Sequence, residues 1–230
     1  MQNECVYVSK PECWAPGINS TDDWLSWANE EKSIEQTNLA PKLEFTSPLF
    51  RRRLGQLCKM TVQVVHDVLQ KNPNLDVPLV FSSNRGEIDR EFTVNRTLIE
   101  DSSVLPAAFS LSVFNAPIAL ASIAFSLKRG YSVIFPSKEN FSDTFKTACA
   151  PILCGDEKEL LFVYGDELIP QEYGVLRPQN AHPLAFATII SAQKKHESDI
   201  KYIPFEDKIP KDSEEFLKSL LKLGNANENR

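Results

Sequence analysis

Two continuous apolar segments constrain the fold of this chain more than any other feature. Leu160–Tyr164 reads Leu-Leu-Phe-Val-Tyr, and Pro183–Ile190 reads Pro-Leu-Ala-Phe-Ala-Thr-Ile-Ile. Short runs of this kind, rich in β-branched and aromatic residues, are typical of strands that are buried on both faces. Because such strands need a layer of helices on each side, they indicate an α/β sheet that is covered on both faces.

Three further strands and several helices are predicted around these segments. The additional strands are expected at 6–8, 77–82 and 131–135, which makes a mixed five-stranded sheet. The apolar strand at 131–135 is expected to be buried. Apolar residues at helical spacing predict helices over 50–69, 88–99, 115–128, 141–153 and 213–223. The helix that follows Asn115 is apolar nearly all round, so we expect it to be buried on every side. In the helix over 88–99, the side chains expected to face inward are Ile88, Phe92, Leu98 and Ile99.

Composition bounds the size and the class of the protein. A chain of 230 residues with 42% apolar content can bury the core of one domain. We expect that domain to span 1–198, followed by a polar extension over 199–230 with one helix and a disordered end.

No apolar run approaches the ~20 residues of a membrane span. The net charge of −6 makes a nucleic acid an improbable partner.

The N-terminus and the cysteines favour a cytoplasmic protein. Met1–Cys5 has neither the basic region nor the apolar region of a secretory signal. The five cysteines are an odd number, and they are scattered without the paired spacing of a zinc site, which favours reduced thiols over disulfides. We therefore expect no metal and no cofactor.

The turn after the strand at 131–135 carries an unusual residue. It reads Pro136-Ser137-Lys138-Glu139-Asn140, and the following helix places Lys138 near a helix N-terminus. Free N–H groups and the helix dipole would stabilise a thiolate there, but they would not stabilise an ammonium group. Two interpretations stay open: Lys138 is simply solvated, or it fills a redundant pocket.

The order of these elements resembles the N-terminal half of the β-ketoacyl synthases, which have a thiolase-like fold. It is more closely similar to the short chain-length factors that accompany ketosynthases in aryl-polyene and other type II polyketide systems. The resemblance spans about Trp14 to Ser191 and rests on four motifs: Arg51-Arg-Arg-Leu, Val80-Phe-Ser-Ser with Arg85-Gly-Glu87, Pro106 to Ile123, and Leu161-Phe-Val-Tyr-Gly-Asp-Glu167. It implies half of a thiolase-like fold.

The resemblance also implies a subunit without catalysis of its own. Lys138 takes the position of the nucleophilic cysteine of the family, and a lysine cannot hold an acyl group as a thioester. The family draws two catalytic histidines from a second half of the fold, and none of His66, His182 and His196 lies in a matching motif. The expected partners are a full-length ketosynthase, which supplies the chemistry and covers the apolar surface left by the missing half, and an acyl carrier protein.

Three groups of residues follow from the resemblance as candidate sites. Tunnel residues that set chain length are Phe109, Leu111, Val113 and Phe114; interface residues are Asn115, Tyr131, Val133 and Phe135; carrier-docking residues are Arg51, Arg52 and Arg53. The tunnel residues could instead plug the core of this chain. The arginines could equally be a solvated helix face.

Two rival functions remain. Thr147-Ala-Cys149-Ala150 copies the letters of a ketosynthase nucleophile motif, so Cys149 with His182 could form a self-sufficient acyltransferase. Its helical context favours a buried structural thiol instead. The other rival is a scaffold that solubilises a ketosynthase without controlling product length.

Overall fold

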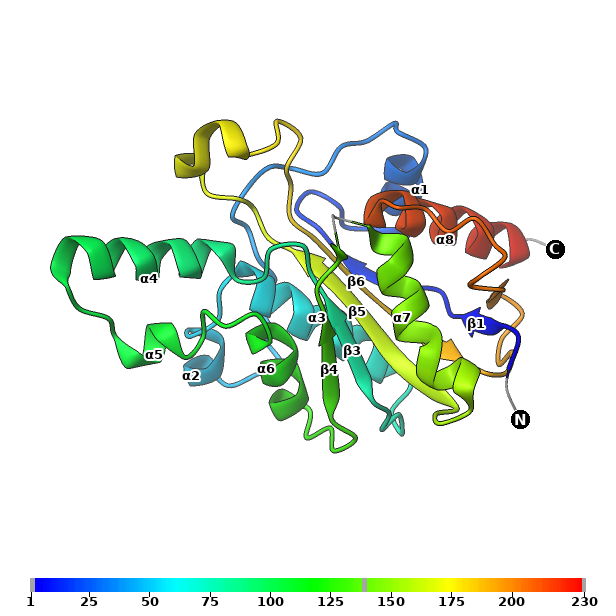
Figure 1. Cartoon of the computed structure of the whole chain (residues 1–230). Coiled ribbons are helices and arrows are strands. Elements are labelled where there is room, and N and C mark those ends of the chain that lie inside the picture. The colour runs from blue at the N-terminus through cyan, green and yellow to red at the C-terminus, as the bar shows by residue number, and fades with distance from the viewer. Residues whose placement is uncertain (1–2, 138–139, 229–230) are drawn as a thin grey trace.

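A computed structural model describes residues 3–137 and 140–228 of the chain (Figure 1). A mixed sheet forms its centre, in the order β4-β3-β5-β6-β1-β7, and β2 also pairs with β6. The strands are β1 (Val6–Val8), β2 (Glu12–Trp14), β3 (Leu79–Ser82), β4 (Tyr131–Ile134), β5 (Glu159–Asp166), β6 (Leu184–Ser191) and β7 (Ile200–Tyr202). The mixed α/β class is confirmed. The count of five strands is too low by the two three-residue strands β2 and β7, because their periodicity is too short to read from sequence.

The strands β4, β3 and β5 are parallel, and the remaining pairs are antiparallel. Parallel strands end at the same edge of a sheet, so the turns after Ile134, Ser82 and Asp166 meet there. Gly155 ends the helix Phe141–Cys154, which follows this edge, in the left-handed conformation with φ of 84°.

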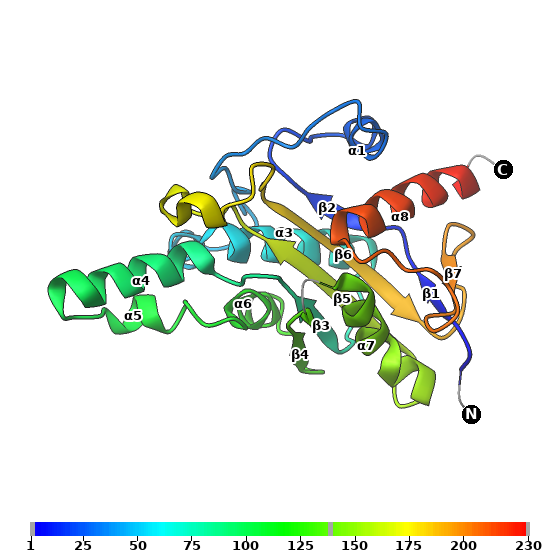
Figure 2. The same cartoon turned by 45° about the horizontal axis from the view of Figure 1, so that its top comes forward.

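Helices cover both faces of the sheet, which confirms the expectation from the two apolar strands (Figure 2). The helices are α1 (Thr21–Ala28), α2 (Pro48–Arg51), α3 (Gln56–Lys71), α4 (Ile88–Asp101), α5 (Pro106–Phe109), α6 (Ala116–Ala124), α7 (Phe141–Cys154), the 3-10 helix η2 (Gln171–Leu176) and α8 (Ser213–Glu228). α3 and α6 contribute to the core on one face, and α1, α7 and α8 contribute to the core on the other. β5 and β6 lie between them and send alternate side chains to each core.

The last helix, α8, is part of the second core. Phe216, Leu217 and Leu220 are fully buried, and the Phe216 ring lies 4.9 Å from the rings of Phe141 and Phe145. The helix predicted over 213–223 is too short, because α8 continues to Glu228. A boundary at residue 198 stays a prediction, and β7 and α8 beyond it belong to the same sheet and core.

Three predicted helices differ from the structure. The helix expected over 50–69 is broken: α2 ends at Arg51, and α3 begins at Gln56. α6 ends at Ala124 rather than near Lys128, and it is not buried on every side, since Ile123 is 68% exposed. On α4, only Val94 is buried, while Leu98 and Ile99 are exposed. These side chains face the surface because no described element lies over them.

Candidate functional site

The edge strand β4 carries most of the residues predicted for a subunit interface. Its only partner among the described strands is β3, so its outer edge offers unpaired backbone groups. Tyr131 and Phe135 are exposed, and Val133 is half-buried against the core. Asn115 donates a hydrogen bond from Nδ2 to the Tyr131 hydroxyl over 3.0 Å, so two predicted interface residues touch. The buried strand expected over 131–135 is wrong on this point, because nothing in the described chain covers its outer side.

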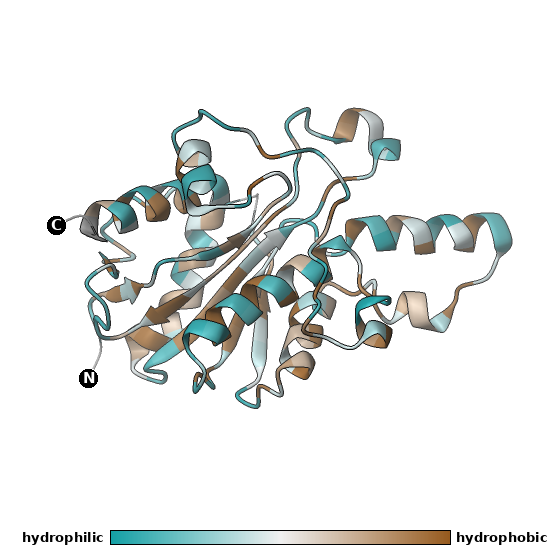
Figure 3. Cartoon of the chain, turned by 180° about the vertical axis from the view of Figure 1, so that it is seen from behind, coloured by the Kyte–Doolittle hydropathy of each residue, from teal (hydrophilic) through white to brown (hydrophobic). Residues whose placement is uncertain are grey.

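The edge of β4 continues into an exposed apolar surface. Eight of the fifteen large apolar side chains that are exposed in the described chain lie between residues 98 and 135: Leu98, Ile99, Leu105, Phe109, Val113, Ile123, Tyr131 and Phe135. α4 and α5 form an arm that extends away from the sheet, next to α6 (Figure 1). From behind, the hydrophobic colour runs over α6 and onto α5 (Figure 3). We call these eight side chains the apolar edge.

The four predicted tunnel residues occupy different environments. Phe114 is half-buried, with its ring centroid 6.4 Å from that of Phe81 and 5.6 Å from that of Phe135. Phe109 is 59% exposed on α5, Val113 is also exposed, and Leu111 is half-buried. The structure therefore joins one tunnel residue, Phe114, to one interface residue, Phe135.

The predicted carrier-docking arginines lie in the break between α2 and α3. Arg52 and Arg53 are exposed and Arg51 is half-buried. Arg51 and Arg52 line a hollow of about 430 Å³ together with Lys42, Lys59 and others. Four cations against the one carboxylate of Glu44 make the hollow basic, although the chain as a whole is acidic. Arg53 is not among the described residues that line it.

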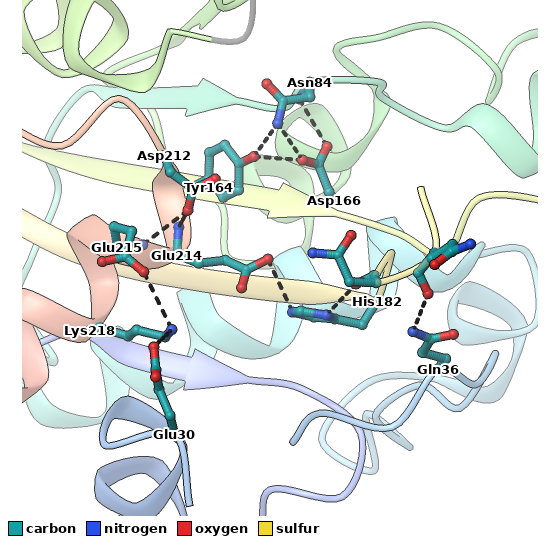
Figure 4. A network of polar contacts seen from close by, with 12 residues as sticks. Glu30, Gln36, Asn84, Tyr164, Asp166, His182, Asp212, Glu214, Glu215 and Lys218 are labelled. Atoms are coloured by element: carbon teal, nitrogen blue, oxygen red, sulfur yellow. Dashed lines mark hydrogen bonds and ion pairs between the residues drawn. The ribbon is translucent and has the colours of Figure 1, made fainter. Parts of the chain in front are cut away.

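Lys138 and Glu139 lie outside the described residues, so the degenerate nucleophile position is not part of the geometry that follows. The neighbouring strand ends hold a network around Asp166 (Figure 4). Asp166 accepts hydrogen bonds from Ser83 Oγ, Asn84 N and Nδ2, and Tyr164 OH over 2.5 to 3.0 Å. Burial raises the pKa of Asp166 in spite of these bonds, and burial and the nearby Asp166 charge raise the pKa of Tyr164.

Two buried glutamates lie beside this network. Glu167 accepts hydrogen bonds from Leu57 N over 3.2 Å and from Asp89 N over 2.9 Å, and Glu87 accepts from Cys58 N over 2.9 Å. The carboxylates thus cap the N-termini of α3 and α4. Burial and the charge of Glu87 raise the pKa of Glu167 to about 8. An added Cβ at Gly55 would lie 2.7 Å from Glu87 Oε2, which explains the glycine at the start of α3.

A cavity of about 270 Å³ opens between these strand ends and the start of α8. His182 lines it, with Nε2 at 3.2 Å from Glu214 Oε1 and Nδ1 at 2.9 Å from the Asn180 carbonyl oxygen (Figure 4). Burial alone would lower the pKa of His182, but the Glu214 carboxylate outweighs burial and raises it. The lining also contains Asp166, Asp212 and Arg85, so charged groups of both signs surround the cavity.

Cys149 is fully buried within α7, and burial raises its pKa far above the ordinary value. A thiol in that environment resists forming the nucleophilic thiolate. Cys149 is also not among the described residues that line the His182 cavity. The structure does not bring this predicted pair together.

Within residues 3–137 and 140–228, no group of three or more histidine, cysteine or acidic side chains could hold a metal ion. No helix of the same ranges is long and apolar enough to cross a membrane.

The sequence interpretation missed the Asp166 network and the capping role of Glu87 and Glu167 as parts of the site. A signal was present, because charged residues that directly follow a buried apolar strand must meet partners at the sheet edge. Tyr164-Gly-Asp-Glu167 and Arg85-Gly-Glu87 are two such sequences. Which partners they meet depends on strands that lie about eighty residues apart, for example Ser83 and Asp166.

The sequence profile described as the β-ketoacyl synthase N-terminal domain matches residues 24–220. The chain belongs to this family, which confirms the resemblance found in the sequence. No sequence among the curated proteins matches it.

Solved structures support the same fold. The ketosynthase ApeO in complex with its chain length factor ApeC from Xenorhabdus doucetiae includes a chain that matches with a TM-score of 0.76 and 21% identity, over 94% of this chain and 91% of that chain. A β-ketoacyl synthase from Burkholderia phymatum STM815 matches with a TM-score of 0.60 and 14% identity, over 83% of this chain and 59% of that chain. The ishigamide ketosynthase/chain length factor matches with a TM-score of 0.59 and 8% identity, over 81% of this chain and 62% of that chain. These similarities confirm the thiolase-like ketosynthase fold.

Proposed function

We propose that this chain is the chain-length-factor subunit of a ketosynthase complex and performs no chemistry itself. A full-length ketosynthase would contribute the nucleophile and the histidines, and it would condense acyl thioesters with a malonyl carrier protein. This chain would contribute one wall of the acyl tunnel and a dimer interface. The complex would serve polyene or polyketide chain elongation in the cytoplasm.

The apolar edge is the observation that carries this proposal. Monomers seldom leave so many large apolar side chains exposed along one stretch of chain, and exposed apolar patches mark interaction surfaces. The unpaired edge of β4 lies in the same region as Phe135 and Tyr131 and can add a partner strand. A ketosynthase is the favoured occupant because a chain of similar fold and nearly the same length as this one comes from a ketosynthase and chain-length-factor complex.

The faces of the sheet do not need the partner. The sequence led us to expect apolar sheet and helix surface left by a missing second half. Helices α7 and α8 cover one face of the sheet and α3 and α6 the other, so the exposed apolar surface lies on the edge strand and on helices α4 to α6. The partner is therefore proposed for the edge rather than for a face.

Co-expression with a ketosynthase tests the interface. Ile123→Asp would place a charge on an exposed position of α6 that the fold does not need, and we expect it to abolish co-elution of the two proteins in size-exclusion chromatography with mass detection. Phe205→Asp is the matched control, since Phe205 is 76% exposed beyond β7, the opposite end of the sheet. Equal co-elution of both variants with the ketosynthase would contradict the proposed interface.

Product analysis separates length control from scaffolding. We expect Phe114→Ala or Phe109→Ala to lengthen the product of the reconstituted complex, because each two-carbon unit needs roughly 2.5 Å of tunnel. A scaffold predicts a changed yield at constant length. If both variants assemble normally and leave the length distribution unaltered, length control by this chain is excluded and the scaffold remains.

The remaining rival is a thiol acyltransferase that uses Cys149. Its buried position in α7 disfavours this function. Loss of condensation in Cys149→Ala with intact assembly would nevertheless establish it.

A further inference from the structure

Phe114 is the most firmly held of the four tunnel residues. Its ring contacts Phe81, which is fully buried on β3, and Phe135, which directly follows β4. Phe109 and Val113 are exposed, and no ring contact is found for Phe109 within the described chain. A side chain can limit the length of a product only if its own position is fixed, because a mobile ring would yield to the growing chain.

Gly86 lies directly against the ring of Phe114. An ideal Cβ at this glycine would lie 2.7 Å from Cδ2 of the Phe114 ring, where ordinary contacts are 3.4 to 4 Å. A methyl group at residue 86 would therefore force the ring to move by about 1 Å. Phe81 is fully buried whereas Phe135 is 65% exposed, so the ring is displaced more easily on the side of Phe135 than on the side of Phe81.

The turn that contains Gly86 is held by the Asp166 network. Gly86 N donates a hydrogen bond to Ser83 Oγ over 2.8 Å, and Ser83 Oγ donates to Asp166 Oδ1, also over 2.8 Å. Gly86 has φ of +64°, a conformation that glycine adopts without strain. The buried carboxylate thus fixes the turn, and the turn presents a backbone without a Cβ to the ring.

We propose that Gly86 is a positioning residue that sets how far the Phe114 ring projects toward the partner. This inference rests on the proposed chain-length-factor function. Gly86 would act only through Phe114 and would touch no substrate.

A double-mutant cycle in the reconstituted complex tests it. The four proteins are the wild type, Gly86→Ala, Phe114→Ala and the double variant. We expect Gly86→Ala to raise the fraction of product that is one two-carbon unit shorter by at least about twofold, since the ring moves into the tunnel. In the Phe114→Ala background, Gly86→Ala should leave the product length unchanged, because no ring remains to be displaced.

Gly130→Ala is the matched control for backbone strain. Gly130 has φ of +79°, and a Cβ there would meet nothing within 4 Å. It carries a comparable conformational cost without a ring contact, so we expect no change in product length.

A second measurement on the isolated chain keeps the positioning role separate from the proposed function. With 4-fluorophenylalanine at position 114, Gly86→Ala should shift the ¹⁹F resonance and Gly130→Ala should not. An unshifted resonance in a folded Gly86→Ala protein overturns the positioning role whatever the complex does. A shifted resonance with unchanged product length, while Phe114→Ala lengthens the product, also overturns the inference but leaves the proposed function standing. If no variant changes product length in an assembled complex, the proposed function itself fails.

Discussion

Single buried carboxylates decide how the helices of this protein begin. The start of α3 has no side-chain cap of its own, since its N-cap is Gly55. Glu167 and Glu87 supply the missing acceptors from distant parts of the chain, on Leu57 N and Cys58 N. The two buried side chains repel each other when both are ionised. Burial and the charge of Glu87 therefore raise the pKa of Glu167 to about 8.

This raised pKa predicts a pH-dependent stability. The folded protein holds a proton on Glu167 up to about pH 8, whereas the unfolded chain releases it near the ordinary pKa of 4.5. The stabilising contribution is therefore present below that ordinary pKa and is lost as the pH rises toward 8. We expect the Tm to fall between about pH 5 and about pH 8, and Glu167→Gln to flatten this slope.

The exposed residue Glu172 provides the control, because Glu172→Gln should leave the slope as it is in the wild type. Thermal unfolding followed by circular dichroism measures all three proteins. A Glu167→Gln protein with the wild-type slope would show that this carboxylate does not titrate differently on unfolding.

At the scale of elements, α8 closes a core that the rest of the fold leaves open. Phe216 contacts Phe141, Phe145 and Tyr202, which belong to α7 and β7. Truncation of a buried aromatic ring in such a cluster leaves a cavity, so Phe216→Ala should lower the free energy of unfolding by about 3 to 5 kcal/mol.

Chemical denaturation measures this loss. Leu223→Ala on the same helix is the control, since Leu223 is 47% exposed and its truncation should cost well under about 1 kcal/mol. Similar small losses in both variants would mean that α8 is not part of the cooperative core.

At the scale of the whole molecule, charge is distributed unevenly. The net charge is −6, yet the break between α2 and α3 places Arg51 and Arg52 beside Lys42 and Lys59. An acidic carrier protein is repelled by the molecule as a whole and attracted to this hollow, so the hollow would direct its approach.

We expect Arg52→Glu to weaken carrier binding to the assembled complex by about fivefold or more at low salt, because an interaction of about 1 kcal/mol is lost or reversed. The difference should shrink at about 0.5 M salt as screening increases. Lys222→Glu, which changes an exposed charge on α8, is the control. Titration of carrier protein in both salt conditions measures the effect, and equal affinities of the two variants would exclude the hollow as the docking site.

The sequence pattern predicted some elements correctly and others wrongly, because it shows which residues are apolar but not what covers them. The strands at Leu160–Tyr164 and Pro183–Ile190 are predicted correctly, since a short segment that is apolar on both faces is typical of a strand covered on both sides. Leu98 and Ile99 were predicted to face inward and are exposed, because helical periodicity shows that a stripe is apolar but not whether this chain or a partner covers it. The same ambiguity made β4 look like a buried strand.

The pattern of neighbouring residues was therefore enough to predict the α/β class and the covered sheet, and the sequence motifs were enough to predict the family. Only the folded arrangement decided that α8 completes the core, that Glu167 and Asp166 meet their partners across the sheet edge, and that Phe114 rests on Gly86. The physical reason is the separation along the sequence. The spacing of buried residues in a segment depends on neighbouring residues, whereas these contacts join residues tens of positions apart and form only once the strands have paired.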